Sequence, residues 1–256
     1  MDTSRVKKYV FWVLACIFLV SFFLRKDLRS INEIVPEVLK EPEQIEVAQQ
    51  GSIVFTRNNY RFEVTPLYKY SISGLVVSRF DYSKVSLERV VQAFPVDFCI
   101  IWGSNVANRI YQLKTIRFSQ DCRWCQVEWN QPVNGFKMDE LSNNHLLVDN
   151  QVLEKRIRSI LRGDQVRISG LLVSLKAVNT SQNDTFNPPY MTWKSSVTRT
   201  DSGAGACEVI YVQDVQILKK GHPVYVFLYK ASFYLLVIMI AWTVISFFSP
   251  WGMNNA

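Results

Sequence analysis

Two long apolar runs, one near each end of the chain, predict membrane-spanning helices. Residues 9–24 and 231–249 contain no charged residue, and neither run has the polar stripe of a soluble amphipathic helix. At about 1.5 Å of rise per residue, the second run extends roughly 28 Å, close to the ~30 Å hydrocarbon core of a bilayer. We therefore assign one transmembrane helix to residues 9–26 and another to residues 222–249, with 231–249 as its core.

The other parts of the chain follow from these two spans. Residues 1–8 and 250–256 are short tails, and we expect the first tail to lie in the cytoplasm. Residues 27–51 are rich in glutamate, contain two prolines and show little periodicity, which is typical of a juxtamembrane linker. Residues 52–218 then form one extramembrane domain, which is long enough to bury a hydrophobic core of its own.

Alternation of apolar and polar residues makes this extramembrane domain mainly β. Residues 52–56 and 60–65 flank the polar residues 57–59, and together they predict a β-hairpin. The spacing of apolar residues predicts two helical insertions, at 84–94 and at 150–162. Further strands are expected at 70–78, 97–102, 114–118, 124–129 and 208–217.

Two segments of the domain have nearly the same sequence. Residues 72–78 and 168–174 agree at six of seven positions, with Gly74 and Gly170 at the same place in each. A glycine inside a strand marks a bulge or bend of the kind that lets a sheet coil.

The second copy belongs to the sequence Gly-Asp-Gln-Val-Arg-Ile-Ser-Gly-Leu-Leu-Val, which begins at Gly163. This sequence resembles strands of small Greek-key barrels of the oligonucleotide/oligosaccharide-binding (OB) type. The resemblance implies a membrane-anchored α+β protein in which two transmembrane helices flank a mainly β, OB-like barrel with two helical insertions.

Composition and charge restrict the class of partner. Hydrophobic residues make up 48% of the chain, and the formal net charge is +7 with a sequence pI of about 9.1. Because the basic residues are scattered among acidic ones, they favour a solvated surface beside an anionic membrane over a nucleic-acid-binding patch.

The residues next to the spans bear on orientation. No small-x-small cleavage site follows the first run, so we interpret it as an uncleaved signal anchor. More basic residues lie near the membrane on the domain side than on the tail side, which favours a cytoplasmic domain. Against this count, long loops are translocated largely regardless of charge, and a short basic tail is hard to move across a membrane. We expect a bacterial inner-membrane protein with both termini inside and a periplasmic domain.

Four of the five cysteines lie in the predicted β domain, at Cys99, Cys122, Cys125 and Cys207. In an oxidising compartment they are candidates for two disulfides in any of three pairings, and in a reducing one for buried thiols. Together with His145 they are also candidate zinc ligands. We favour disulfides or buried thiols, and we expect no metal or other cofactor.

Three further features are candidates for catalysis. Cys122 and Cys125 have the spacing of a thiol oxidoreductase, but no βαβ pattern surrounds them. The sequence from Asp201 to Ala204 resembles the Asp-Ser/Thr-Gly-Ala loop of retroviral-type aspartic proteases, which implies a shared carboxylate pair in a homodimer. His145 is a candidate general base, although its position after Ser-Asn-Asn favours a hydrogen-bonding turn residue. No catalytic residue is therefore assigned.

Three stretches of the domain, residues 102–105, 142–147 and 198–208, resemble a group of uncharacterised bacterial membrane-anchored proteins. The resemblance implies one coherent domain and carries no activity.

For function, we expect a non-enzymatic two-pass protein whose domain binds a partner protein, forms a homo-oligomer or joins a membrane complex. This expectation rests on the lack of a recognisable catalytic pattern. The alternatives are a membrane-tethered enzyme, with Asp201 or the pair Cys122 and Cys125 at its centre, and an OB-like module for glycans or nucleic acid. Besides the lipid bilayer, a protein is the expected partner, and nucleic acid is disfavoured.

Overall fold

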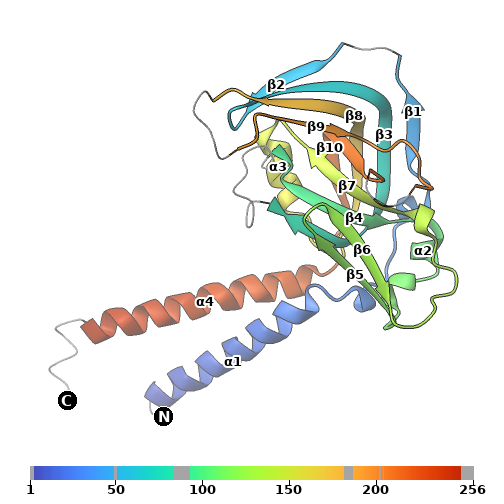
Figure 1. The fold of residues 1–256 in the computed structure, drawn as a ribbon. Coiled ribbons are helices and arrows are strands. Elements are labelled where there is room, and N and C mark those ends of the chain that lie inside the picture. Colours follow the sequence, from blue (N-terminus) through green and yellow to red (C-terminus); the bar gives the residue numbers. More distant parts are fainter. Residues whose placement is uncertain are drawn as a thin grey trace. The chain divides into compact units, whose positions relative to one another are not determined.

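The structure is a computed structural model that describes residues 3–48, 51–82, 93–181, 187–201, 203 and 205–248. It is an α+β protein with a mostly sheet core and two terminal apolar helices (Figure 1). The chain forms two compact units, one made of both chain ends and the other of residues 28–221.

The terminal unit is a pair of helices, α1 (Thr3–Leu24) and α4 (Pro223–Phe248). Both are long and apolar enough to cross a membrane, which agrees with the two predicted spans. The Phe18 ring stacks on Tyr229 with ring centroids 5.0 Å apart, and the Arg25 guanidinium lies 3.7 Å from the centre of the same Tyr229 ring. The first half of α1 and the last half of α4 line one groove, so the two helices are antiparallel.

The larger unit is built on an eight-stranded sheet and a separate two-stranded sheet. The strands of the larger sheet are β1 (Glu43–Glu46), β2 (Ile53–Arg57), β3 (Tyr60–Asp81), β4 (Val96–Ile101), β7 (Leu141–Leu147), β8 (Gln165–Asn179), β9 (Tyr190–Lys194) and β10 (Glu208–Lys219). The smaller sheet is the hairpin of β5 (Ile116–Asp121) and β6 (Trp124–Trp129).

The strand order of the larger sheet is β1-β3-β4-β7-β10-β8-β9, with β2 also paired to β3. An additional pairing joins β3 to β8 along much of their length. Strands β7 and β10 are parallel, and the other pairings are antiparallel. The predicted hairpin at 52–65 is confirmed as β2 and β3.

Short helices connect the strands of the domain. They are η1 (Leu28–Ser30), η2 (Pro36–Leu39), α2 (Gly103–Ala107), η5 (Ile110–Gln112), η6 (Met138–Glu140) and α3 (Gln151–Arg158). Helix α3 begins where the Asn150 side chain accepts hydrogen bonds from two backbone amides of its first turn, and it corresponds to the predicted helix at 150–162. The other predicted helix, at 84–94, lies almost entirely outside the described residues.

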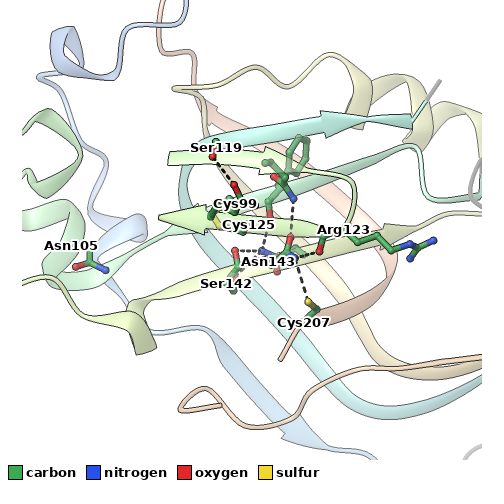
Figure 2. The surroundings of a disulfide bond; sticks show 12 residues. Cys99, Asn105, Ser119, Arg123, Cys125, Ser142, Asn143 and Cys207 are labelled. Carbon is green, nitrogen blue, oxygen red and sulfur yellow. Dashed lines mark hydrogen bonds between the residues drawn. A yellow bond between two sulfur atoms is a disulfide. The ribbon is translucent and has the colours of Figure 1, made fainter. Parts of the chain in front are cut away.

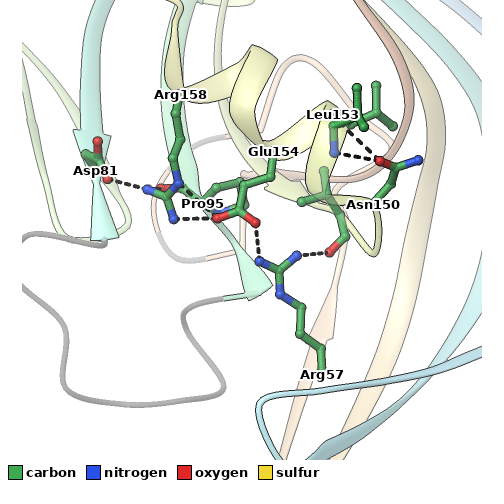
Figure 3. A network of polar contacts seen from close by, with 9 residues as sticks. Arg57, Asp81, Pro95, Asn150, Leu153, Glu154 and Arg158 are labelled. Carbon is green, nitrogen blue, oxygen red and sulfur yellow. Dashed lines mark hydrogen bonds and ion pairs between the residues drawn. The ribbon is translucent and has the colours of Figure 1, made fainter.

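A chain of ion pairs holds α3 to the sheet (Figure 3). Arg57 of β2 pairs with Glu154, Glu154 pairs with Arg158 one turn later, and Arg158 reaches Asp81 at the end of β3. These side chains are largely shielded from water, so the chain of pairs orients the helix more strongly than isolated surface pairs would.

The two similar glycine-containing segments are neighbours in space. Ile72 of β3 lies opposite Ile168 of β8 in the antiparallel pairing. A β-carbon at Gly74 would lie 2.7 Å from the Ile101 carbonyl oxygen, and one at Gly170 would lie only 2.1 Å from the carbonyl oxygen of Tyr211. Opposite Gly170, the register between β8 and β10 shifts by one residue. The glycines therefore allow backbones to approach where the sheet bends, as the sequence predicts.

The segment expected to be a linker packs onto the β domain. Leu28, Ile31 and Val38 are buried, and β1 pairs with β3. The Gln165 side chain accepts a hydrogen bond from the Val35 amide at 2.8 Å and donates one to the Glu33 carbonyl at 2.8 Å. Apolar residues spaced without helical or strand periodicity can still be buried, which is why the pattern did not indicate this packing.

Besides β1, two strands arise where the sequence indicated none. The stretch Ser142 to His145, expected to form a turn, lies in β7 with its side chains buried. The short strand β9, which pairs with β8, also lies outside the strands expected from the sequence.

Candidate functional site

The hairpin of β5 and β6 is fastened to the larger sheet by a disulfide between Cys99 of β4 and Cys125 of β6 (Figure 2). The Cα atoms of the two cysteines are 5.6 Å apart, within the range usual for a disulfide. Cys99 is fully buried and faces a cluster that includes Ile116 and Phe118 of β5. The disulfide thus fixes the hairpin over one face of β4.

The same face of the sheet carries four polar residues, which we call the polar row: Asp97, Asn143, His145 and Cys207. Asp97 of β4 lies directly opposite His145 of β7 in the antiparallel pairing, so both side chains project from the same face. Asn143 lies two residues earlier on β7 and shares that face, because strand side chains alternate. Cys207 immediately precedes β10, which runs parallel to β7.

Asn143 connects the hairpin to Cys207. Its side-chain oxygen accepts a hydrogen bond from Gln120 Nε2 at 2.8 Å, and its Nδ2 donates to the Arg123 carbonyl at 2.6 Å. The same Nδ2 lies 3.3 Å from the Cys207 sulfur, as Figure 2 shows. The buried amide therefore positions both the turn of the hairpin and the thiol.

Asp97 is a carboxylate in the middle of an otherwise apolar strand and is fully buried. Its Oδ2 lies 2.6 Å from Nδ1 of His145 and also accepts a hydrogen bond from the Tyr82 hydroxyl. A buried carboxylate needs such partners, because an unpaired charge in this environment is costly. Burial and the Asp97 carboxylate raise the pKa of Tyr82 well above its usual value.

His145 contacts both Asp97 and Cys207. Only 5% of its surface is exposed. Burial alone favours the neutral imidazole, but the Asp97 carboxylate and a hydrogen bond with Cys207 outweigh burial and raise the pKa of His145 to about 9. At neutral pH, His145 is therefore mainly an imidazolium that lies between the side chains of Asp97 and Cys207.

Aromatic side chains lie beside the polar row. The Arg123 guanidinium lies 4.8 Å from the ring centre of Trp193 and 5.9 Å from that of Tyr82. Trp193 packs edge-to-face on Phe94, with ring centroids 5.1 Å apart. One guanidinium nitrogen of Arg123 is buried and has no protein hydrogen-bond partner among the described residues.

A second acidic group lies on the opposite face of β10. Glu208 is buried, and its Oε2 has no hydrogen-bond partner among the described residues. Burial, and then the charge of Asp201, raise the pKa of Glu208 to about 8. Asp201 itself is exposed and accepts a hydrogen bond from Ser196 Oγ at 2.5 Å.

The cysteines that the sequence suggested as a redox pair or as metal ligands do not form a single cluster. Cys122 and Cys125 are not joined to each other, since Cys125 is bonded to Cys99 and Cys122 is an exposed free thiol. Cys207 is a partly buried free thiol beside His145. Among the described residues, no group of three or more His, Cys, Asp or Glu side chains is arranged to hold a metal ion.

Sequence reasoning missed Asp97, Asn143 and Tyr82 as members of one site. Asp97 and His145 are 48 residues apart in the chain and Asp97 and Tyr82 are 15 apart, so no local spacing connects them. One available signal was the lone carboxylate within the apolar strand Val96–Ile101, because an acid buried at such a position needs a specific partner.

Comparison of the chain with models of protein families, with curated proteins and with solved structures finds no match.

Proposed function

We propose that this is a two-pass protein of a bacterial inner membrane, with an OB-like β domain on the external side that binds a partner protein or a second copy of the chain. The apolar helices α1 and α4 would form the membrane anchor. The observation that carries the binding proposal is a pair of exposed tryptophans on the disulfide-fastened hairpin.

The strand pairings support an OB-like architecture. Strand β3 pairs with β4 and β8, β4 with β7, β7 with β10, and β10 with β8, so the series of pairings leads back to β3. An OB fold is a five-stranded Greek-key barrel, and these five strands match that number. Helix α3 lies between β7 and β8 in the chain.

The disulfide supports an external location of the domain. Disulfides persist in the periplasm and other oxidising compartments and are rare in the cytosol. The antiparallel arrangement of α1 and α4 is compatible with two crossings that leave both termini on the same side.

The β5–β6 hairpin offers a surface suited to a protein partner. Trp124 and Trp129 of β6 are 48% and 50% exposed, although each is large and apolar. Exposed tryptophans on a rigid element are typical anchors of protein interfaces, because they supply a large contact area at little conformational cost. The disulfide would keep the hairpin, and so both tryptophans, in a fixed position before binding.

Site-specific photo-crosslinking in living cells tests the binding proposal. A photoreactive residue at position 124 should give a discrete adduct, either of twice the chain's mass for a second copy or of another mass for a different protein. The same residue in place of Tyr190 of β9, an equally aromatic position that is 64% exposed, should give no such adduct. Identical adduct patterns at both positions, or no adduct at position 124, would contradict the proposed surface.

A membrane-impermeant maleimide tests the external location. In intact cells, the exposed thiol of Cys122 should react without reductant, whereas Cys125 should react only after reduction of its bond to Cys99. Both signals are measured in a Cys207→Ser background, because Cys207 is a second free thiol, and Cys122→Ser in that background is the matched control for the first signal. A domain that reacts only after cell lysis would place it in the cytoplasm and overturn this part of the proposal.

A further inference from the structure

The polar row brings a thiol, an imidazole and a carboxylate together from three neighbouring strands. Asp97 comes from β4, His145 from β7, and Cys207 from the residue just before β10. None of these residues is close to another in the sequence. The strand order β4-β7-β10 is what places them side by side.

The three side chains form a series in which the carboxylate orients the imidazole and the imidazole lies beside the thiol. The Asp97 carboxylate holds Nδ1 of His145 at 2.6 Å, and the Tyr82 hydroxyl holds the carboxylate in turn. Cys207 lies on the same face, two residues before Val209, which is the residue of β10 opposite His145. Because Nδ1 is occupied, Nε2 is the ring nitrogen left for the Cys207 thiol. A nucleophile bonded to a base that a third group orients is the arrangement of a catalytic triad.

Exposure increases from Asp97 through His145 to Cys207. Asp97 is fully buried and His145 is 5% exposed, whereas Cys207 is only partly buried. A base and its orienting carboxylate are thus shielded from water, whereas the cysteine is partly exposed to solvent. The other cysteines lack this environment, since Cys99 and Cys125 are bonded to each other and Cys122 lies exposed on the hairpin.

We infer that Cys207, His145 and Asp97 form a cysteine-nucleophile site that acts on an acyl group carried in an ester or amide bond. This activity goes beyond partner binding and replaces the expectation of a non-enzymatic domain.

The proposed step transfers an acyl group to sulfur. The Cys207 sulfur attacks the carbonyl carbon and forms a C–S bond, while its proton resides on Nε2 of His145. The tetrahedral intermediate collapses with cleavage of the C–O or C–N bond, and the leaving group takes the proton from His145. Water then attacks the thioester with His145 as base, which releases a carboxylic acid and regenerates the thiol.

The other two residues have positioning roles in this scheme. Asp97 fixes the orientation of the imidazole and balances the charge of its protonated form. Asn143 Nδ2 points to the Cys207 sulfur at 3.3 Å and so fixes the position of the thiol beside the hairpin.

Alkylation by iodoacetamide of the full-length protein in detergent, without reductant, tests the activation of Cys207. An ordinary thiol is only about 1% ionised at pH 6.5, because its pKa is about 8.5. We expect Cys207 to react at least tenfold faster than Cys122 at pH 6.5, and His145→Gln to remove this difference. The Cys122 rate, measured in the same molecule by peptide mass spectrometry, is the internal reference. Equal rates for the two thiols in the wild-type protein would overturn the proposal.

Acyl transfer is tested with p-nitrophenyl acetate as probe. The wild-type protein should release p-nitrophenolate in a burst of about one equivalent and carry an acetyl group on Cys207. Cys207→Ser should abolish the burst, and His145→Gln should slow it at least tenfold, whereas Cys122→Ser should leave it unchanged. Because His145→Gln alters a buried network, Asp97→Asn serves as a second variant, and an unaltered melting temperature is required of each. Acetylation at other sites only, or a burst that survives in Cys207→Ser, would refute the assignment.

Discussion

The buried side chain of Glu208 makes the stability of the β domain depend on pH. It is buried at the start of β10, and the Oε2 atom lacks a protein hydrogen-bond partner among the described residues. Its pKa of about 8 lies above the ordinary value of 4.5, chiefly because burial penalises the carboxylate. A raised pKa means that the folded state binds the proton more tightly than the unfolded state does. Its contribution to stability is therefore greatest below pH 4.5 and is lost as pH rises toward 8.

The variant Glu208→Gln should remove this pH dependence. Glutamine has nearly the same shape but cannot ionise, so at pH 8.5 we expect the variant to be more stable than wild type by at least about 1 kcal/mol. At pH 4.5 the two proteins should differ little. Denaturant unfolding of the detergent-solubilised protein at both pH values measures the difference. Glu128→Gln, at an exposed position of β6, is the control and should match wild type throughout; a variant less stable than wild type at pH 8.5 would show that the ionised carboxylate has a partner.

At the scale of elements, the paired strands β3 and β8 depend on their glycines for different contacts. Gly74 accommodates the side chain of Ile100 and the backbone of Ile101, whereas Gly170 lies against the backbone of β10 at Tyr211. A side chain can rotate away from a new methyl group, but a paired strand cannot move without losing hydrogen bonds. Gly170 is therefore the more restrictive of the two positions.

Gly170→Ala should destabilise the domain. Its β-carbon would lie 2.1 Å from the Tyr211 carbonyl oxygen, so the β8–β10 pairing would have to shift, at a cost of roughly 1–3 kcal/mol or more. The matched control is Gly51→Ala, because no heavy atom lies within 4 Å of a β-carbon there. That change should alter stability by less than about 0.5 kcal/mol. Thermal unfolding compares the two variants. Equal melting temperatures would mean that the β8–β10 pairing accommodates a methyl group at Gly170 without loss of stability.

At the scale of the whole molecule, the disulfide joins two parts of the domain that share few backbone hydrogen bonds. The β5–β6 hairpin forms its own sheet, so its position over β4 depends on side-chain packing and on the bond between Cys99 and Cys125. This bond also helps to hold Arg123, and through its carbonyl Asn143, beside Cys207.

Cys125→Ser should therefore weaken both the fold and the polar row. The bond closes a loop with a sequence separation of 26 residues, and loss of such a cross-link is expected to cost roughly 3 kcal/mol. Limited proteolysis should then cleave the hairpin first, since it loses its disulfide cross-link to β4. Cys122→Ser, which removes an exposed free thiol from the same turn, should leave both stability and cleavage pattern unchanged. A hairpin that stays protease-resistant in Cys125→Ser would indicate that packing alone holds it.

The two terminal apolar helices, the first hairpin and the glycine bends could be predicted from the sequence, because each depends on residues close together in the chain. The uncharged run of 19 residues and the alternation of apolar and polar residues before and after residues 57–59 can be recognised without knowledge of any distant contact. Strand β7 could not be predicted in the same way, since Ser142, Asn143, Asn144 and His145 look like a turn until partners for their polar groups are known. The neighbouring strands and the hairpin provide partners for Asn143, Asn144 and His145.

The same distinction between local sequence and long-range contacts applies to the candidate site. Sequence alone indicated that Cys207 and His145 carry reactive groups, and that two apolar segments flank a mainly β domain. The tertiary structure decided that Cys125 bonds to Cys99 and not to Cys122, and that Asp97, His145 and Cys207 meet on one face. Strand order and register determine which side chains from distant parts of the sequence become neighbours. Both are set by the packing of the whole domain, because hydrogen bonds between distant strands form only when the complete sheet buries its apolar face.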